Sequence, residues 1–104
     1  MNSTQTLLER VRTSLDSHSD YAVSKALQIS RQRMSKYMRG ADELHDENII
    51  CRAAEIVGDD PAFVLAKIRR ERATSDEAKA AWLRLETLAK RASRRGADAA
   101  LAAA

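Results

Sequence analysis

The residues with the clearest chemical potential are basic side chains in a stretch that contains no acid. No acidic residue lies between Asp20 and Asp42, and the basic residues there are Lys25, Arg31, Arg33, Lys36 and Arg39. Arginine and lysine bind phosphate groups, and arginine can also form paired hydrogen bonds with the edge of guanine. The pattern is typical of a surface that binds a polyanion, and a solvated helix face is the alternative interpretation.

The rest of the charge is distributed unevenly. The overall charge is +3, from 18 basic and 15 acidic residues. From Asp42 to Asp60 seven acidic residues accompany one basic residue, Arg52, which gives a local charge of −6. Beyond Pro61 ten basic and five acidic residues give +5. A basic block beside an acidic one favours a binding face on an otherwise balanced domain.

Other reactive residue types form no recognisable constellation. His18 and His45 lie far apart in the sequence and lack the spacing of metal ligands, so no metal site is predicted. Cys51 falls in a helical stripe without an adjacent histidine and is expected to be an ordinary thiol. No two carboxylates form a catalytic pair. We therefore predict that the protein is not an enzyme and uses no cofactor and no small-molecule ligand.

Length and composition favour a single all-α domain. The chain has 104 residues and is 44% hydrophobic, but 19 residues are alanine, which leaves larger side chains for one core. Abundant alanine, leucine, arginine and glutamate favour helix and exclude a β-sandwich, a barrel and a parallel-sheet nucleotide-binding fold. A single cysteine, no secretory signal and no apolar run of roughly 20 residues predict a cytoplasmic protein without a membrane segment.

Apolar periodicity and capping residues predict six helices. Their approximate ranges are residues 4–17, 20–27, 31–39, 46–57, 61–72 and 74–95. The clearest boundary is Asp60 followed by Pro61, because the missing N–H of proline costs nothing in the first turn of a helix. Gly40 and Gly58 are expected to end the third and fourth helices. The alanine-rich residues 96–104 are expected to form a flexible tail.

The second and third helices are joined by only residues 28–30, and so short a connection predicts the sharp crossing of a helix-turn-helix. The apolar residues that can pack between these helices are Val23, Leu27, Ile29, Met34 and Tyr37. The far side of the third helix would then project and could enter the major groove of DNA. We expect the base-reading side chains to be Arg31, Gln32, Arg33 and Lys36. We expect the phosphate contacts to come from Ser19, Lys25, Ser30, Ser35 and Arg39.

Residues 19–40 read SDYAVSKALQISRQRMSKYMRG and resemble, without a gap, the helix-turn-helix of Cro/CI-type phage repressors. The positions that match are Val23, Ile29, Ser30, Met34, Ser35 and Gly40. The later stretch ENIICRAAEIVGDDPAFVLA looks like the fourth and fifth helices of that family. The overlapping run DPAFVLAKIRRERA…EAKAAWLRL is similar to small regulators of filamentous phages and related prophages. The resemblance covers about residues 4–88. It implies a five-helix DNA-binding domain with base-reading positions at Arg31, Gln32 and Lys36, and Arg33 adjacent.

Three positions depart from the family pattern. Asp20 stands where the family often has a glutamine near a phosphate, and an aspartate would repel that phosphate, so this contact is not expected. Ser24 stands where the family usually has alanine, at the point where the two helices touch. Gln28 stands at the turn glycine and is expected to adopt a positive φ at a cost of about 1 kcal/mol.

The C-terminal helix carries apolar residues at positions 78, 81, 85, 88 and 92, the alternating spacing of a coiled-coil seam. We expect Trp82, Leu85 and Leu88 to form a homodimer interface, because tryptophan is a good anchor. Two alternatives are that this helix folds back onto its own domain, or that its basic face lies on a membrane surface.

These features predict a helix-turn-helix DNA-binding domain over residues 1–73, with a dimerising helix over 74–95. The expected function is that of a phage or prophage transcriptional repressor, bound as a homodimer to a palindromic operator in double-stranded DNA. The alternative is a protein-interaction module, an antitoxin or antirepressor, in which the acidic segment 42–60 or the last helix holds a partner protein.

Overall fold

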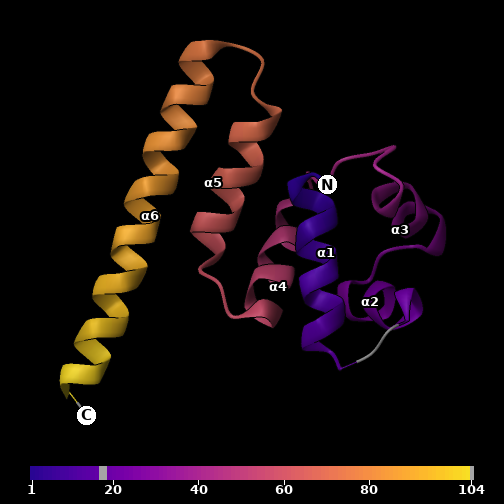
Figure 1. Ribbon diagram of the computed structural model, residues 1–104, viewed down its shortest axis with the longest axis horizontal. Helices are drawn as coiled ribbons and strands as arrows, with labels where there is room; N and C mark the ends of the chain where they lie inside the picture. The colour runs from indigo at the N-terminus through magenta and orange to yellow at the C-terminus, as the bar shows by residue number, and fades with distance from the viewer. Residues whose placement is uncertain (17–18, 104) are drawn as a thin grey trace.

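The computed structural model describes residues 1–16 and 19–103, and the described residues form six helices and no strand (Figure 1). His18, which the sequence excludes as a metal ligand, lies outside the described residues. The helices are α1 (Ser3–Ser14), α2 (Asp20–Leu27), α3 (Arg31–Met38), α4 (Glu47–Val57), α5 (Pro61–Arg72) and α6 (Asp76–Ala103). The all-α class predicted from composition is therefore confirmed.

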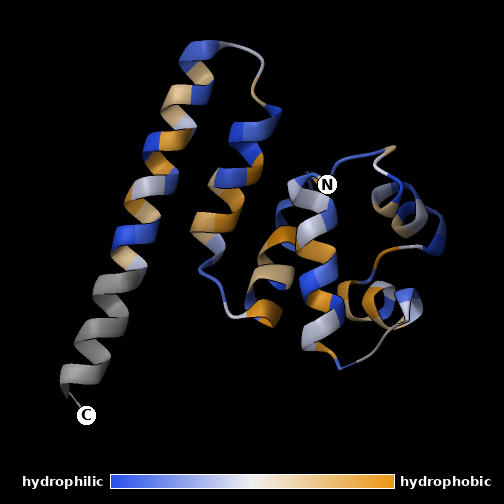
Figure 2. Cartoon of the chain, viewed as in Figure 1, coloured by the Kyte–Doolittle hydropathy of each residue, from blue (hydrophilic) through white to orange (hydrophobic). Residues whose placement is uncertain are grey.

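Helix α1 lies at the centre of the molecule and contacts α2, α3, α4 and α5 (Figure 1). The larger side chains that are completely buried in the core are Leu8, Val11, Val23, Leu27, Tyr37, Leu44 and Ile50. Hydrophobic residues recur along α1, α4 and α5, whereas hydrophilic residues dominate α3 at the edge of the molecule (Figure 2). Only Met34 and Tyr37 of α3 are buried in this core, so most of the surface of α3 stays open to solvent.

Local signals set the helix ends. Asn2 and Gln5 form a reciprocal capping box at the start of α1. The predicted boundary at α5 is confirmed: Asp60 caps the helix by accepting from the backbone N–H of Ala62, and Pro61 is its first residue. Gly58 ends α4 in the left-handed region with φ of 79°, a conformation that glycine adopts at little cost.

Among the helices, α5 is the one against which α6 packs, and the two run antiparallel at the side of the molecule opposite α3 (Figure 1). Glu86 of α6 is buried and accepts from Arg70 of α5, with 2.6 Å between the carboxylate oxygen and Nε. This hydrogen bond raises the pKa of Arg70 above its ordinary value. Near neutral pH, far below this pKa, Arg70 is charged and the ion pair stabilises the fold. That contribution to the free energy of unfolding is lost only when the pH rises through the raised pKa.

The backbone of α6 is helical through Ala103, whereas the sequence places the end of this helix at residue 95. Gly96 does not end the helix, and the alanines that follow have the highest helix propensity of any residue. Side chains from residue 94 onward lie outside the described part. Within the described chain, no helix combines the length and the apolar character needed to cross a membrane.

Candidate nucleic-acid interface

The turn between α2 and α3 is built by backbone geometry at three successive residues. Gln28 ends α2 in the left-handed region with φ of 56°, which confirms the positive φ expected at this non-glycine position. The backbone N–H of Ile29 donates to the carbonyl of Ser24 at 2.9 Å, and the Ile29 side chain is buried. Ser30 then caps α3 by accepting from the backbone N–H of Arg33 at 3.2 Å. The chain therefore leaves α2 and enters α3 within three residues.

The predicted packing between the two helices is confirmed. Val23 and Leu27 from α2 are fully buried, and Met34 and Tyr37 of α3 are almost or fully buried against the same core. Because Met34 and Tyr37 are three residues apart, they lie on one face of α3 and fix its rotation about its own axis. The opposite face is thereby turned to solvent.

Arg52 is a positioning residue that sequence reasoning missed. Its guanidinium extends from α4 and donates to the backbone carbonyl of Leu27 at 3.1 Å, which satisfies an otherwise free acceptor at the end of α2. A contact between residues 25 positions apart leaves no local signal in the sequence. The turn is consequently supported from α4 as well as from its own backbone.

All the side chains predicted to read bases or to contact phosphates are exposed, and α2, the turn and α3 bring them to one end of the molecule. Gln32 and Lys36 lie opposite the buried face of α3, since successive residues turn by about 100° around a helix. Arg31 and Arg33 lie on the two flanks. The guanidinium of Arg33 is 5.9 Å from the centroid of the Tyr37 ring. The hydroxyls of Ser19 and Ser30 also cap helices, so they serve a local structural role.

The end of the molecule formed by α2, the turn and α3 differs from the rest in its ion pairs. Within residues 1–16 and 19–103, no carboxylate forms an ion pair with the five predicted contacts that carry positive charge, which are Lys25, Arg31, Arg33, Lys36 and Arg39. The acidic segment 42–60 is paired instead with basic residues of α1 and α5. Its ion pairs are Asp59 with Arg10 at 2.5 Å, Glu47 with Arg69 at 2.6 Å and Glu43 with Arg72 at 3.9 Å. The cations around α3 are thus left without an ion-pair partner in the described part of the chain, which favours a positive field on that surface.

Asp20, the acidic departure at the start of α2, has a partner that the sequence did not suggest. Arg12 of α1 forms an ion pair with its carboxylate and a second one with Glu9. Asp20 also lies in the first turn of α2, where a negative charge interacts favourably with the helix dipole. The negative charge next to the basic face is therefore countered internally.

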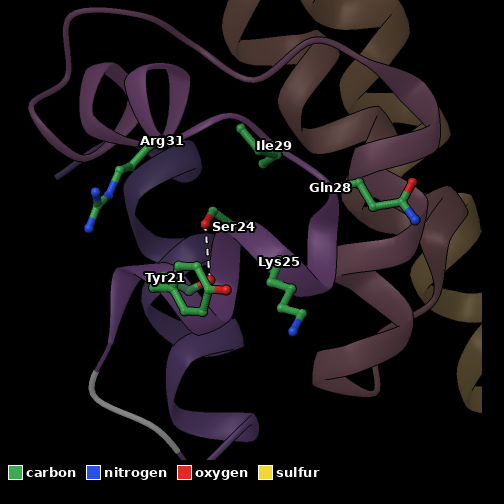
Figure 3. Close-up of a pocket in the computed structure, with 6 residues that line it drawn as sticks. All are labelled: Tyr21, Ser24, Lys25, Gln28, Ile29 and Arg31. Atoms are coloured by element: carbon green, nitrogen blue, oxygen red, sulfur yellow. Dashed lines mark hydrogen bonds between the residues drawn. The ribbon is translucent and has the colours of Figure 1, made fainter.

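Two neighbouring hollows open beside the turn. The first has a volume of about 460 Å³ and is lined by Tyr21, Ser24, Lys25, Gln28, Ile29 and Arg31 (Figure 3). The second, of about 490 Å³, is lined by Ser19, Asp20, Tyr21, Ser24, Arg31, Met34, Ser35, Met38 and Arg39. Tyr21 is 61% exposed at the border of both, and sequence reasoning did not select it. The sequence held one signal that could have indicated Tyr21, because Lys25 follows it by four residues on the same helix and the two side chains are therefore neighbours.

Cys51 and His45, for which the sequence predicts no catalytic or metal-binding role, lie on α4 and just before it. Cys51 is a partly buried free thiol on α4, and His45 is exposed before α4. Among the described residues, no three His, Cys, Asp or Glu side chains are grouped so that they could hold a metal ion.

Comparison of this chain with known protein families, with curated proteins and with solved structures yields no match. Evidence for a function therefore comes from the chain's own residues. These residues form a short, well-supported two-helix unit whose outer helix presents cations and an amide without carboxylate partners in the described part.

Proposed function

We propose that this protein is a sequence-specific double-stranded-DNA-binding regulator of transcription, a phage or prophage repressor with a Cro/CI-type helix-turn-helix domain. The observation that carries the proposal is the exposed face of α3, where cations without a carboxylate partner among the described residues flank Gln32. A helix of this diameter fits the major groove, and its side chains match the chemistry of base edges and phosphates.

In the proposed mechanism, α3 enters the major groove and α2 lies across the backbone. Gln32 can pair with the N6 and N7 atoms of adenine, and lysine or arginine can pair with O6 and N7 of guanine. Lys25 and Arg39 bind phosphates and set the register of α3 in the groove. The bound protein would repress by blocking access of RNA polymerase to the promoter.

We further propose that the repressor acts as a homodimer through α6. Leu85 and Leu88 of α6 are 50% and 51% exposed, so half of each side chain is open to solvent beside α5. Trp82 is partly buried and lies one turn before Glu86, on the side that faces α5. The leucines are therefore better placed than the tryptophan to contact a second copy. Two-fold dimers bind half-sites whose centres lie about 34–36 Å apart.

Selection of bound sites from a random double-stranded DNA pool at near-physiological salt tests this function. The expected result is an enriched inverted repeat with half-sites about one helical turn apart. The matched control is the double variant Gln32→Ala/Lys36→Ala, which should enrich no sequence, beside Lys79→Ala/Lys90→Ala on α6, which should enrich the wild-type site. An enriched single half-site would remove the dimer, and no enrichment by folded protein would overturn the function.

The second candidate is an antitoxin or antirepressor that binds another protein, and the exposed leucines of α6 are the observation that favours it. The acidic segment 42–60 favours it less, because several of its carboxylates already pair within the chain. Tight binding of a partner protein, abolished by Leu85→Asp and unaffected by Gln32→Ala/Lys36→Ala, would support this candidate over the repressor.

A further inference from the structure

Arg31 has different surroundings from Gln32 and Lys36. The buried residues Met34 and Tyr37 define the inner side of α3, and a turn of about 100° per residue places Gln32 and Lys36 opposite them. Arg31 lies on the flank of α3 that faces α2. It borders both hollows beside the turn, whereas Gln32 and Lys36 border neither of these two.

The first hollow is lined by two cations, Lys25 and Arg31, together with polar residues and the apolar Ile29. Lys25 comes from α2 and Arg31 from the start of α3, so cations from two helices line the hollow, on either side of Tyr21 (Figure 3). No ion pair to a carboxylate is present for either cation in the described part of the chain. The nearby Asp20 is already held by Arg12. The electrostatics therefore favour an anion in this hollow.

Tyr21 supplies a neutral donor and one wall of the same hollow. The Nζ atom of Lys25 lies 6.0 Å from the centroid of the Tyr21 ring, within the range of a cation–π contact. Ser24 already donates its hydroxyl hydrogen to the backbone carbonyl of Tyr21 at 3.0 Å. The phenol of Tyr21 is mostly exposed, and Gln28 points away from it (Figure 3). The donors available to a ligand are thus an ammonium, a guanidinium and a phenol.

We propose that this hollow receives a phosphate of the DNA backbone, held by Lys25, Arg31 and the Tyr21 hydroxyl. Arg31 then contacts the backbone at the edge of the major groove and does not read a base, which leaves Gln32 and Lys36 as the base-reading pair. An anionic phosphodiester satisfies both cations and accepts from the phenol, and base edges offer no such charge. The proposal rests on the proposed function, because it assigns the backbone contact of the same DNA-binding surface.

Titrations of Arg31→Ala and Tyr21→Phe by fluorescence anisotropy at several salt concentrations test the assignment. The probes are the duplex selected by the wild-type protein and a scrambled duplex of equal length. Arg31→Ala should weaken binding to both duplexes by about tenfold. It should also reduce the slope of log affinity against log salt by about 0.9, because one fewer counterion is released. Tyr21→Phe should weaken binding to both duplexes by about threefold and leave the slope unchanged, because the phenol is neutral.

The matched control is Lys67→Ala, which removes a cation from α5, outside the hollow and outside the proposed α6 interface, and should leave affinity and slope unchanged. Circular dichroism and thermal unfolding verify that each variant is folded. Loss of preference at a single base pair in Arg31→Ala, with an unchanged slope, would show that Arg31 reads a base and would overturn the assignment. Wild-type binding by Tyr21→Phe would remove the tyrosine contact. If the wild-type protein bound neither duplex, the proposed function would fail together with this proposal.

Discussion

Two basic regions of this molecule use the same residue types in opposite ways. In α5, Arg69, Arg70 and Arg72 each face a carboxylate from another part of the chain. In α2 and α3, the cations have no carboxylate partner within the described residues. The count of positive charges is similar, and the difference lies in their pairing. Paired arginines hold helices together, whereas cations without such partners create the field that attracts a polyanion.

The α5 arginines also differ among themselves. Arg70 binds Glu86, whose side chain is only 11% exposed, through two hydrogen bonds that connect α5 to α6. Arg69 binds Glu47, whose side chain is 62% exposed. A pair that is largely shielded from water contributes more than a pair in solvent, so Arg70 and Glu86 should matter most for the position of α6.

The largest expected effect comes from removing both side chains at the outermost part of α3. Gln32→Ala/Lys36→Ala should lower affinity for the selected DNA site by about 10²–10³-fold, because each base-reading contact contributes roughly 1–3 kcal/mol. Stability should be unchanged, since both side chains are exposed. Anisotropy titration and urea unfolding of the same preparations measure the two quantities. Retained preference for the selected site would place base reading elsewhere.

Substitutions that break the ion pairs of α5 should lower stability and leave binding to a DNA half-site unchanged. Glu86→Ala leaves Arg70 without its partner and should lower the free energy of unfolding by about 1–2 kcal/mol, measured by urea denaturation. The matched variant Glu47→Ala breaks a more exposed pair and should cost less than about 1 kcal/mol. Affinity for a duplex that holds a single half-site should not change in either variant, because neither glutamate lies on α2 or α3. Equal destabilisation by the two substitutions would contradict the distinction drawn from burial.

Lys25→Ala tests whether a cation of α2 contacts the DNA backbone. The variant should weaken binding to all DNA sequences alike and reduce the salt slope by about one unit, because Lys25 neutralises one phosphate. Lys67→Ala, a lysine of α5, is the control and should bind with the wild-type slope. A change in base preference at Lys25 would contradict its assignment to the backbone.

The smallest expected effect concerns the turn that positions α3. Gln28→Gly should raise the free energy of unfolding by about 0.5–1 kcal/mol, because glycine adopts the observed φ of 56° without the strain of a side chain. DNA affinity should stay the same, since Gln28 is not in the proposed contact set. Thermal unfolding measures the change, and a decrease in stability would indicate that the Gln28 side chain contributes contacts of its own.

Several features of the fold follow from neighbouring residues alone. Asp60 with Pro61 predicts the start of α5, and the three-residue connection at residues 28–30 predicts the turn. The positive φ of Gln28 is expected instead from the resemblance to the repressor family, in which a glycine holds this position. The first two signals depend on the conformational limits of single residues and on hydrogen bonds within one turn of helix, so they can be read locally. The apolar pattern of α3 likewise predicted its buried face, because helical periodicity relates sequence spacing to direction.

The C-terminal helix shows where periodicity is insufficient. The sequence pattern groups positions 78, 81, 85, 88 and 92 into one seam. In the structure, α6 turns Trp82 and Glu86 toward α5 and leaves Leu85 and Leu88 exposed. A buried glutamate on a contact face is predictable only when its partner, Arg70 on a different helix, is known. The orientation of an amphipathic helix therefore depends on what covers it.

The sequence by itself determined the all-α class, the three-residue connection between α2 and α3 and the set of exposed side chains on α3, because these depend on residue propensity and period. Only the tertiary structure decided which charges are neutralised. Arg10 with Asp59, Arg12 with Asp20 and Arg52 with the Leu27 carbonyl join residues on different helices. It also placed Arg31 beside α2, between the two hollows. These contacts depend on distances between helices, and a chain of residues specifies such distances only after its core has packed.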